Sequence, residues 1–138
     1  KKKKQNSNTF TMKEAIEAYN YIKNESTFKV VKTFNVKIYL AGDIDIIKQA
    51  CRKYCLEVGL CVTVTPTLFI YTGGEEFGVE IGLINYPRFP DAKINIIKKA
   101  EALAVQCREA ACQHSYLIMT PDETIWNTTR KNPEDSKK

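Results

Sequence analysis

An Asn-Tyr-Pro-Arg-Phe-Pro segment in the second half of the chain carries side chains that suit a flat, anionic ligand. The ring of Phe89 or Tyr86 offers a face for base stacking, which contributes about 1–3 kcal/mol per base in nucleic-acid complexes. The planar guanidinium of Arg88 can meet a phosphate, and Asn85 or Asn95 can recognise a polar edge. The two prolines stiffen the segment, because each fixes its own φ and restricts the residue before it. The same loop could instead cover one end of a sheet and leave its arginine in solvent.

Groups for nucleophilic or acid–base catalysis are sparse. A nucleophile needs a base within hydrogen-bond reach, and the only imidazole is that of His114, at the expected end of a helix, where the helix dipole favours it. The acidic pair Asp43 and Asp45 stands at an expected helix start, and the pair Glu75 and Glu76 stands in an expected turn, where acids are common for structural reasons. We therefore expect no catalytic residue, no metal site and no cofactor, and we predict that the chain is not an enzyme.

The charge of the chain is concentrated at its ends. The net charge is +5, but six of the positive charges are terminal lysines at positions 1–4, 137 and 138. Duplex nucleic acid requires a basic face rather than basic tails, so we do not expect it as a partner. No apolar run approaches the roughly 20 residues that a membrane-spanning helix needs, so we expect no membrane partner either.

The five cysteines are Cys51, Cys55, Cys61, Cys107 and Cys112. An odd number at these spacings is a poor disulfide framework, and Cys51 and Cys55 lie four residues apart, on one face of an expected helix. We interpret the five as reduced core thiols of a cytoplasmic protein.

Hydrophobic periodicity and punctuating residues predict three helices and six strand segments. Helices are expected over residues 11–24, 43–58 and 91–113, and strands over residues 28–40, 61–65, 68–72, 77–86, 116–119 and 124–127. The residue pairs and caps behind these boundaries are a capping box of Thr11 with Glu14, an N-cap at Asp43, a stop at Gly59 and a cap at Asp91.

Three further features bear on packing. Residues 73–76 are expected to form a hairpin loop. Gly78 and Gly82 share one face of the strand that follows, where glycine often marks a bulge or the close approach of another group. A stripe of small residues on the last helix, Ala100, Ala104, Cys107 and Ala111, could pack against a second protomer or inside the same subunit.

The order of elements after the first helix is β-α-β-β-α-β. This split βαβ order predicts an α+β fold, with an antiparallel sheet packed on two helices and an accessory N-terminal helix. We expect a single domain over residues 11–130, with disordered tails over residues 1–10 and 131–138.

Four segments carry a resemblance to a known family. They are Lys37-Ile-Tyr-Leu-Ala-Gly-Asp43, Tyr71-Thr-Gly-Gly-Glu-Glu76, Gly82-Leu-Ile-Asn-Tyr-Pro-Arg-Phe-Pro90 and Thr120-Pro-Asp-Glu-Thr-Ile-Trp126. Over about residues 36–127 the chain resembles the first family of phage Thoeris anti-defence sponge proteins. The resemblance implies a phage protein in the cytoplasm of an infected bacterial host, which binds glycocyclic ADP-ribose and holds it intact. It also implies self-assembly as dimers or hexamers, with cyclic oligonucleotides bound at separate sites in some members.

The resemblance assigns ligand contacts residue by residue. The family's pocket uses an aromatic ring and an asparagine near the start of the long helix, which match Phe89 and Asn95. It also uses arginines late in that helix, and Arg108 matches one of them. The second arginine has no counterpart, because Gln113 and His114 occupy the following turn. With the loop residues, the expected ligand set is Asn85, Tyr86, Arg88, Phe89, Asn95 and Arg108.

Two other functions remain open. A small enzyme could degrade a nucleotide signal with Glu75, Glu76 or His114. An inhibitor module could instead pair its sheet edge, or the helix over residues 11–24, with a host protein. The leading prediction is a protein that binds and sequesters a cyclic ADP-ribose-type signal without degrading it.

Overall fold

The computed structural model describes residues 11–23 and 26–131. The chain divides into two units, residues 1–30 and 31–138. In the first unit, α1 (Met12–Lys23) begins at the expected capping box, since Thr11 Oγ1 accepts from the Glu14 amide and Glu14 Oε1 accepts from the Thr11 amide. The expected tails, apart from Lys131, lie outside the described residues, and the single-domain boundary stays a prediction.

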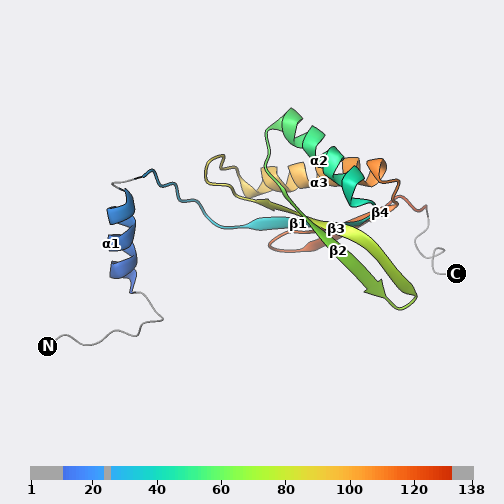
Figure 1. Cartoon of the computed structure of the whole chain (residues 1–138), viewed down its shortest axis with the longest axis horizontal. Helices are drawn as coiled ribbons and strands as arrows, with labels where there is room; N and C mark the ends of the chain where they lie inside the picture. The colour runs from blue at the N-terminus through green and yellow to red at the C-terminus, as the bar shows by residue number, and fades with distance from the viewer. Residues whose placement is uncertain (1–10, 24–25, 132–138) are drawn as a thin grey trace. The chain divides into compact units, whose positions relative to one another are not determined.

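The second unit is a five-stranded antiparallel sheet with two helices on one face (Figure 1). The strands lie in the order β2-β3-β1-β4-β5. The bounds are β1 Asn35–Ala41, α2 Ile44–Val58, β2 Thr63–Tyr71, β3 Gly74–Ile84, α3 Lys93–Ala110, β4 Ser115–Met119 and β5 Thr124–Thr128. The predicted α+β class and the predicted element order are confirmed.

The core lies between the sheet and the helices. Ile81, Ile38 and Ile118 form a fully buried row across β3, β1 and β4, because the register pairs Ile38 with both of the others. From α3, Ala100 and Ala104 pack into this core with no exposed surface. The small-residue stripe therefore packs inside the subunit, where small side chains let α3 lie close to its neighbours.

Helix ends follow local chemistry. Asp43 caps α2 by accepting from the amides of Asp45 and Ile46, and Gly59 ends it in the left-handed region at φ 71°. Asp91 does not cap α3 as expected. The N-cap is Ala92, which has no side-chain bond, and the Asp91 carboxylate accepts from the Ala92 amide instead.

The C-terminal end of α3 is a Schellman motif. The Gln113 amide donates to the Arg108 carbonyl and the Cys112 amide to the Glu109 carbonyl, while Cys112 adopts φ 56°. The helix thus ends at Ala110, three residues before the expected boundary, because the backbone reverses at Cys112.

Three strand boundaries differ from expectation. β1 begins at Asn35 and not at residue 28, because residues 28–34 pair with no strand and β-propensity needs a neighbouring strand to take effect. β2 runs through Pro66 without a break, which an edge strand tolerates. The hairpin turn is shorter than expected, so Glu75 and Glu76 lie in β3 rather than in a loop.

Thiol burial is uneven. Cys51 and Cys107 are buried, with their sulfurs 3.9 Å apart, and Cys55 is half-buried. Cys61 and Cys112 are exposed, so the interpretation of all five as core thiols is wrong for these two. All five are free thiols in this structure, as expected from the odd count.

Candidate functional site on the open face of the sheet

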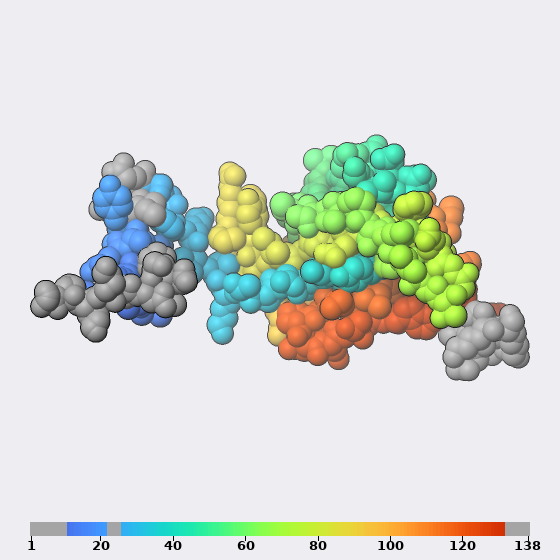
Figure 2. Space-filling view, turned by 60° about the horizontal axis from the view of Figure 1, so that its bottom comes forward, coloured from blue at the N-terminus to red at the C-terminus, as the bar shows by residue number. Residues whose placement is uncertain are grey.

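Both helices of the second unit, α2 and α3, lie on one face of the sheet, and neither crosses the opposite, open face (Figure 1). Strand alternation sends Val36, Ile38 and Leu40 into the core, so Lys37 and Tyr39 lie on this open face. In Figure 2 the band of β1 is visible between the β2–β3 hairpin and the β4–β5 pair. Polar and aromatic side chains on β1 are therefore accessible from solvent.

A tyrosine–glutamate pair lies on the open face. The Tyr39 phenol donates a 3.0 Å hydrogen bond to Oε1 of Glu80, directly opposite on β3. Lys37 Nζ lies 3.4 Å from the other oxygen, Oε2. Burial and then the hydrogen bond to Glu80 raise the pKa of the Tyr39 phenol above its ordinary value. Tyr39 therefore stays a neutral hydrogen-bond donor over the physiological pH range.

Aromatic rings surround Tyr39. Phe69 of β2 packs edge-to-face on it, with ring centroids 6.4 Å apart. The ring of Phe69 can reach across β3 because Gly78 has no side chain, and a Cβ at Gly78 would lie 2.5 Å from Cε2 of Phe69. The expectation that Gly78 permits the close approach of another group, here the Phe69 ring, is confirmed. Gly82 permits a close approach of Thr63 in the same way, since a Cβ at Gly82 would lie 2.6 Å from Oγ1 of Thr63.

A hollow of about 470 Å³ opens at the end of this face where β1 leaves the sheet for α2. Its size falls within the range of small-molecule sites. Aromatic side chains on the two flanking strand pairs border it, with Phe69 and Tyr71 on the hairpin and Trp126 on β5. The full lining is Tyr39, Leu40, Ala41, Phe69, Tyr71, Glu76, Gln113, His114, Ser115, Tyr116, Leu117, Trp126 and Arg130.

Two of the three residues proposed for a degrading enzyme line this hollow. Glu76 shares the open face with Phe69, its cross-strand partner. His114 also lines the hollow, but its Nδ1 lies 3.3 Å from Oγ1 of Thr129. Strand alternation puts the His114 side chain on the same side as the buried Tyr116, away from the open face. Glu75 is not among the lining residues.

The expected ligand residues of the Asn-Tyr-Pro-Arg-Phe-Pro loop gather at a different place, between β3 and α3. The Arg88 guanidinium lies 5.3 Å from the centroid of the Phe89 ring, and Tyr86 lies 5.8 Å from the same ring. Phe89 is 60% exposed. The cavity beside these rings holds about 30 Å³, roughly the volume of one water molecule. The loop presents a surface for stacking rather than an enclosed pocket.

Asparagines in this loop make hydrogen bonds within the protein. Asn85 donates from Nδ2 to the Lys32 carbonyl and accepts the Asp91 amide at Oδ1. Asn95 donates from Nδ2 to Asp91, whose other oxygen lies 3.3 Å from Nζ of Lys99. These bonds, that of Asn95 first, lower the pKa of the Asp91 carboxyl. The network explains how the loop keeps its shape before α3.

Arg108 lies apart from the loop. It is thirteen residues beyond Asn95 on α3, which separates the two by about 20 Å. Its Nη1 donates a 2.6 Å hydrogen bond to Oδ1 of Asn127, and its guanidinium lies 5.4 Å from the ring centroid of Tyr116. Only 8% of Arg108 is exposed. The six expected ligand residues thus form a loop group of five and a separate, buried arginine, and their contact with a ligand stays a prediction.

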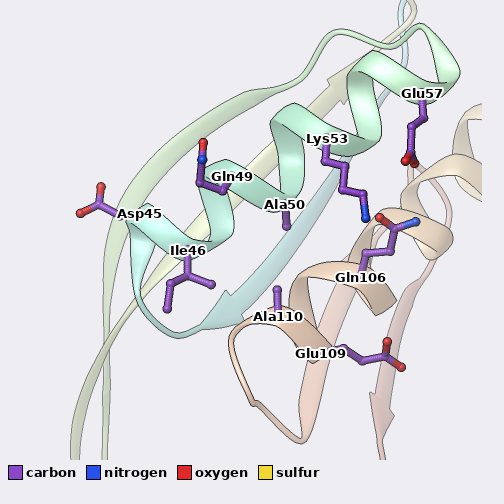
Figure 3. Close-up of a pocket in the computed structure, with 9 residues that line it drawn as sticks. All are labelled: Asp45, Ile46, Gln49, Ala50, Lys53, Glu57, Gln106, Glu109 and Ala110. Atoms are coloured by element: carbon purple, nitrogen blue, oxygen red, sulfur yellow. The ribbon is translucent and has the colours of Figure 1, made fainter.

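A larger hollow of about 840 Å³ lies on the outer surface of the helical layer (Figure 3). In Figure 3, Lys53 extends from α2 toward Gln106 of α3, whereas Asp45 and Gln49 point away from α3. The lining contains no aromatic ring that could stack on a base. It is a groove between two packed helices, and its size alone does not indicate a nucleoside site.

The structure describes residues 11–23 and 26–131, and two absences concern this part of the chain. No three His, Cys, Asp or Glu side chains of this part of the chain are placed to share a metal ion. None of its helices has the length and apolarity required to cross a bilayer.

Comparison with known proteins gives a fold relationship. No protein-family model and no curated protein matches the chain. A phage SAM lyase in the apo state superimposes with a TM-score of 0.61 and 17% identity, over 78% of this chain and 99% of that one. A phage SAM lyase in complex with S-methyl-5'-thioadenosine gives a TM-score of 0.56 and 15% identity, over the same shares. The chain shares the fold of these enzymes, and the resemblance to the Thoeris sponge family is not confirmed.

The prediction that the chain is not an enzyme is contradicted by these neighbours, because the fold that it shares is the fold of a lyase. That prediction rested on the lack of a nucleophile beside a base in the sequence. A lyase cleaves a bond without water, and fixed dipoles and charges can carry much of such catalysis without a nucleophile. The lack of a nucleophile–base motif was therefore a poor reason to exclude an enzyme.

Sequence reasoning missed Tyr39, Glu80, Phe69 and Trp126. A signal for the first two was present, since Lys37 and Tyr39 alternate with three core residues and Glu80 lies between two glycines. The contact between Tyr39 and Glu80 had no signal, because the two residues are 41 positions apart and meet only through strand register.

Proposed function

We propose that this chain is an enzyme of the SAM lyase type, which binds S-adenosylmethionine in the hollow on the open sheet face and releases S-methyl-5'-thioadenosine. The observation that carries the proposal is the Tyr39–Glu80 pair in its aromatic surroundings, at a hollow of about 470 Å³. The shared fold with phage SAM lyases supports the choice of reaction.

The aromatic side chains fit the nucleoside half of such a substrate. Adenine can stack on Phe69, Tyr71 or Trp126, each of which lines the hollow. Glu80 can accept hydrogen bonds from ribose hydroxyls, as acidic residues do in other nucleotide sites. The 3.0 Å bond from Tyr39 fixes one oxygen of Glu80, and Lys37 balances its charge.

The chemistry suits this environment. When the bond between the sulfonium sulfur and the amino-acid carbon chain breaks, the sulfur keeps the electron pair and becomes a neutral thioether. The departing carbon is attacked by the substrate's own carboxylate, which forms the new C–O bond of a lactone as the C–S bond breaks. Because positive charge disappears from sulfur, contact between the sulfur and the aromatic side chains favours the step, since removing water from a charge is costly. The residues named here bind and orient the substrate.

The test is turnover of S-adenosylmethionine followed by mass spectrometry. We expect S-methyl-5'-thioadenosine to accumulate, with no ¹⁸O from labelled water in either product. Tyr39→Phe and Glu80→Gln should each lower the rate about tenfold or more, since each removes an interaction of a charged group. Tyr86→Phe in the distant loop is the matched control and should retain the wild-type rate. Absence of both turnover and binding would refute the proposal.

A second candidate rests on the loop group. Arg88 over Phe89, with Tyr86 beside it, offers a ring and a guanidinium to a phosphorylated cyclic nucleotide. We propose binding of a cyclic ADP-ribose-type signal, or of a cyclic oligonucleotide, as the alternative at this place. Phe89→Ala should then weaken binding of that ligand in calorimetry while leaving S-adenosylmethionine turnover unchanged. If Phe89→Ala changes neither the binding of that ligand nor the turnover of S-adenosylmethionine, the loop is not a ligand site.

The setting that we propose for either activity is counter-defence by a phage inside its bacterial host. Native mass spectrometry with both ligand classes would report bound mass together with the number of subunits. If native mass spectrometry finds a single subunit in every condition, the predicted dimer or hexamer is wrong.

A further inference from the structure

Two opposite charges stand at opposite sides of the hollow on the open face. Glu76 lies on β3, beyond the last residue of β1. Arg130 lies two residues beyond the end of β5 and lines the hollow. From β3 to β5 there are three strand spacings, about 14 Å between the backbones. Both side chains line the hollow that separates them.

Within the described part of the chain, neither charge has an ion-pair partner. Among residues 11–23 and 26–131, no oppositely charged side chain lies within ion-pair distance of Glu76 or Arg130, whereas Glu80 on the same face is paired with Lys37. The main-chain amide of Arg130 donates a hydrogen bond to Oγ1 of Thr128. The side chains of residues 11–23 and 26–131 therefore leave the Arg130 guanidinium and the Glu76 carboxylate without a charged partner.

We infer that Glu76 and Arg130 form a zwitterion subsite that holds the amino-acid half of the substrate. Glu76 takes the α-ammonium group and Arg130 takes the α-carboxylate. The inference rests on the proposed function, because it gives the second half of S-adenosylmethionine a place beside the nucleoside half. With this subsite, the hollow selects ligands that carry an α-amino-acid group.

The chemistry of the two side chains suits these roles. Arginine presents parallel N–H groups that match a carboxylate in a bidentate arrangement. A carboxylate accepts from an ammonium group with its three donors. In an α-amino acid the ammonium and carboxylate groups are bonded to the same carbon. A protein carboxylate and a guanidinium that contact these two groups through charged hydrogen bonds of about 2.8 Å therefore stand roughly 9 Å apart. Two side chains reaching inward from backbones about 14 Å apart can meet that span.

The zwitterion subsite predicts that the chain binds two related nucleosides with different affinities. S-adenosylhomocysteine carries the amino-acid group and an uncharged sulfur, so the lyase step cannot consume it. S-methyl-5'-thioadenosine carries the same nucleoside with no amino-acid group. In calorimetry with the full chain we expect S-adenosylhomocysteine to bind about tenfold or more tightly than S-methyl-5'-thioadenosine.

Two charge-neutral variants test the assignment. Glu76→Gln and Arg130→Gln should each weaken S-adenosylhomocysteine about tenfold and change S-methyl-5'-thioadenosine less than twofold. The double variant should lose less than the two single losses combined, because both side chains hold one group. Arg52→Gln, which is exposed on α2 of the opposite layer, is the matched control. Circular dichroism melting would show that each variant is folded.

The outcomes separate the subsite from the function. If S-methyl-5'-thioadenosine binds but the variants weaken both ligands equally, or neither, then the zwitterion subsite is overturned and the proposed function stands. If neither nucleoside binds the wild-type chain, both are overturned. Selective loss of S-adenosylhomocysteine in both variants establishes the subsite.

Discussion

Tyr39 and Glu80 face each other across β1 and β3, and the Tyr39 phenol donates a 3.0 Å hydrogen bond to the Glu80 carboxylate. They are 41 residues apart in the chain. Two side-chain hydrogen bonds between strands border the hollow in the described part of the chain, this one through Tyr39 and the bond from Ser115 Oγ to Thr128 Oγ1. The Tyr39–Glu80 bond couples the ionisation of a tyrosine to a carboxylate at the candidate site.

The first prediction concerns the pKa of Tyr39. Glu80→Gln removes the acceptor charge and should lower this pKa, because hydrogen bonding to Glu80 and its negative charge both raise it while Lys37 lowers it. NMR titration of labelled tyrosine, assigned with Tyr39→Phe, measures the change. An unchanged pKa would mean that burial alone sets it.

The same pair affects stability at high pH. A phenol whose pKa is higher in the folded chain stabilises the fold fully below the unfolded value of about 10. That contribution is lost as the pH rises through the folded pKa. Urea unfolding from pH 8 to 11 should therefore show a steeper loss of stability for the wild type than for Tyr39→Phe. Parallel curves would contradict the prediction.

Gly78 gives the second prediction. A Cβ there would lie 2.5 Å from the Phe69 ring and still closer to the Leu40 carbonyl oxygen, so a methyl group must displace the ring and the backbone. Gly78→Ala should lower the free energy of unfolding by about 1–3 kcal/mol. Gly73→Ala is the control, since a Cβ at Gly73 meets no atom within 4 Å. Equal stability of the two variants would show that the sheet adapts freely.

The third prediction concerns Arg108. Arg108→Met removes the hydrogen bond to Asn127 and the contact with the Tyr116 ring, which leaves Asn127 partly unsatisfied. We expect a loss of about 1–3 kcal/mol in unfolding free energy. Arg52→Met on the exposed side of α2 should change stability much less. If Arg108→Met instead weakens nucleotide binding in a fully folded protein, Arg108 is a ligand contact, as the resemblance implied.

Thiol reactivity is the fourth prediction. Cys61 and Cys112 are exposed and should react with a maleimide in the native protein. Cys107 is buried, and the hydrogen bond with Cys51 together with burial raises the pKa of its thiol. It should therefore react only after unfolding. Mass spectrometry of peptides after timed labelling would assign each site, and rapid native labelling of Cys107 would contradict the packing of α2 against α3.

Local sequence was sufficient for much of the fold. The cap at Asp43 and the stop at Gly59 were read correctly, because each acts on backbone groups within a few residues. The glycines of β3, which share one face of that strand, indicated a close approach that the structure contains. Expectations failed where a neighbour decides the outcome: residues 28–34 have the composition of a strand but pair with no other strand.

The candidate site was decided by tertiary structure. Sequence reasoning placed the ligand at the loop around Phe89 because its residues are contiguous, and it excluded an enzyme because no nucleophile–base pair was visible. The hollow instead brings together Tyr39, Phe69 and Trp126 from β1, β2 and β5. The period of a strand fixes which face a side chain takes, but strand order and register fix which residues meet there. Those depend on pairings between segments distant in the chain, and a single sequence does not contain them as a local pattern.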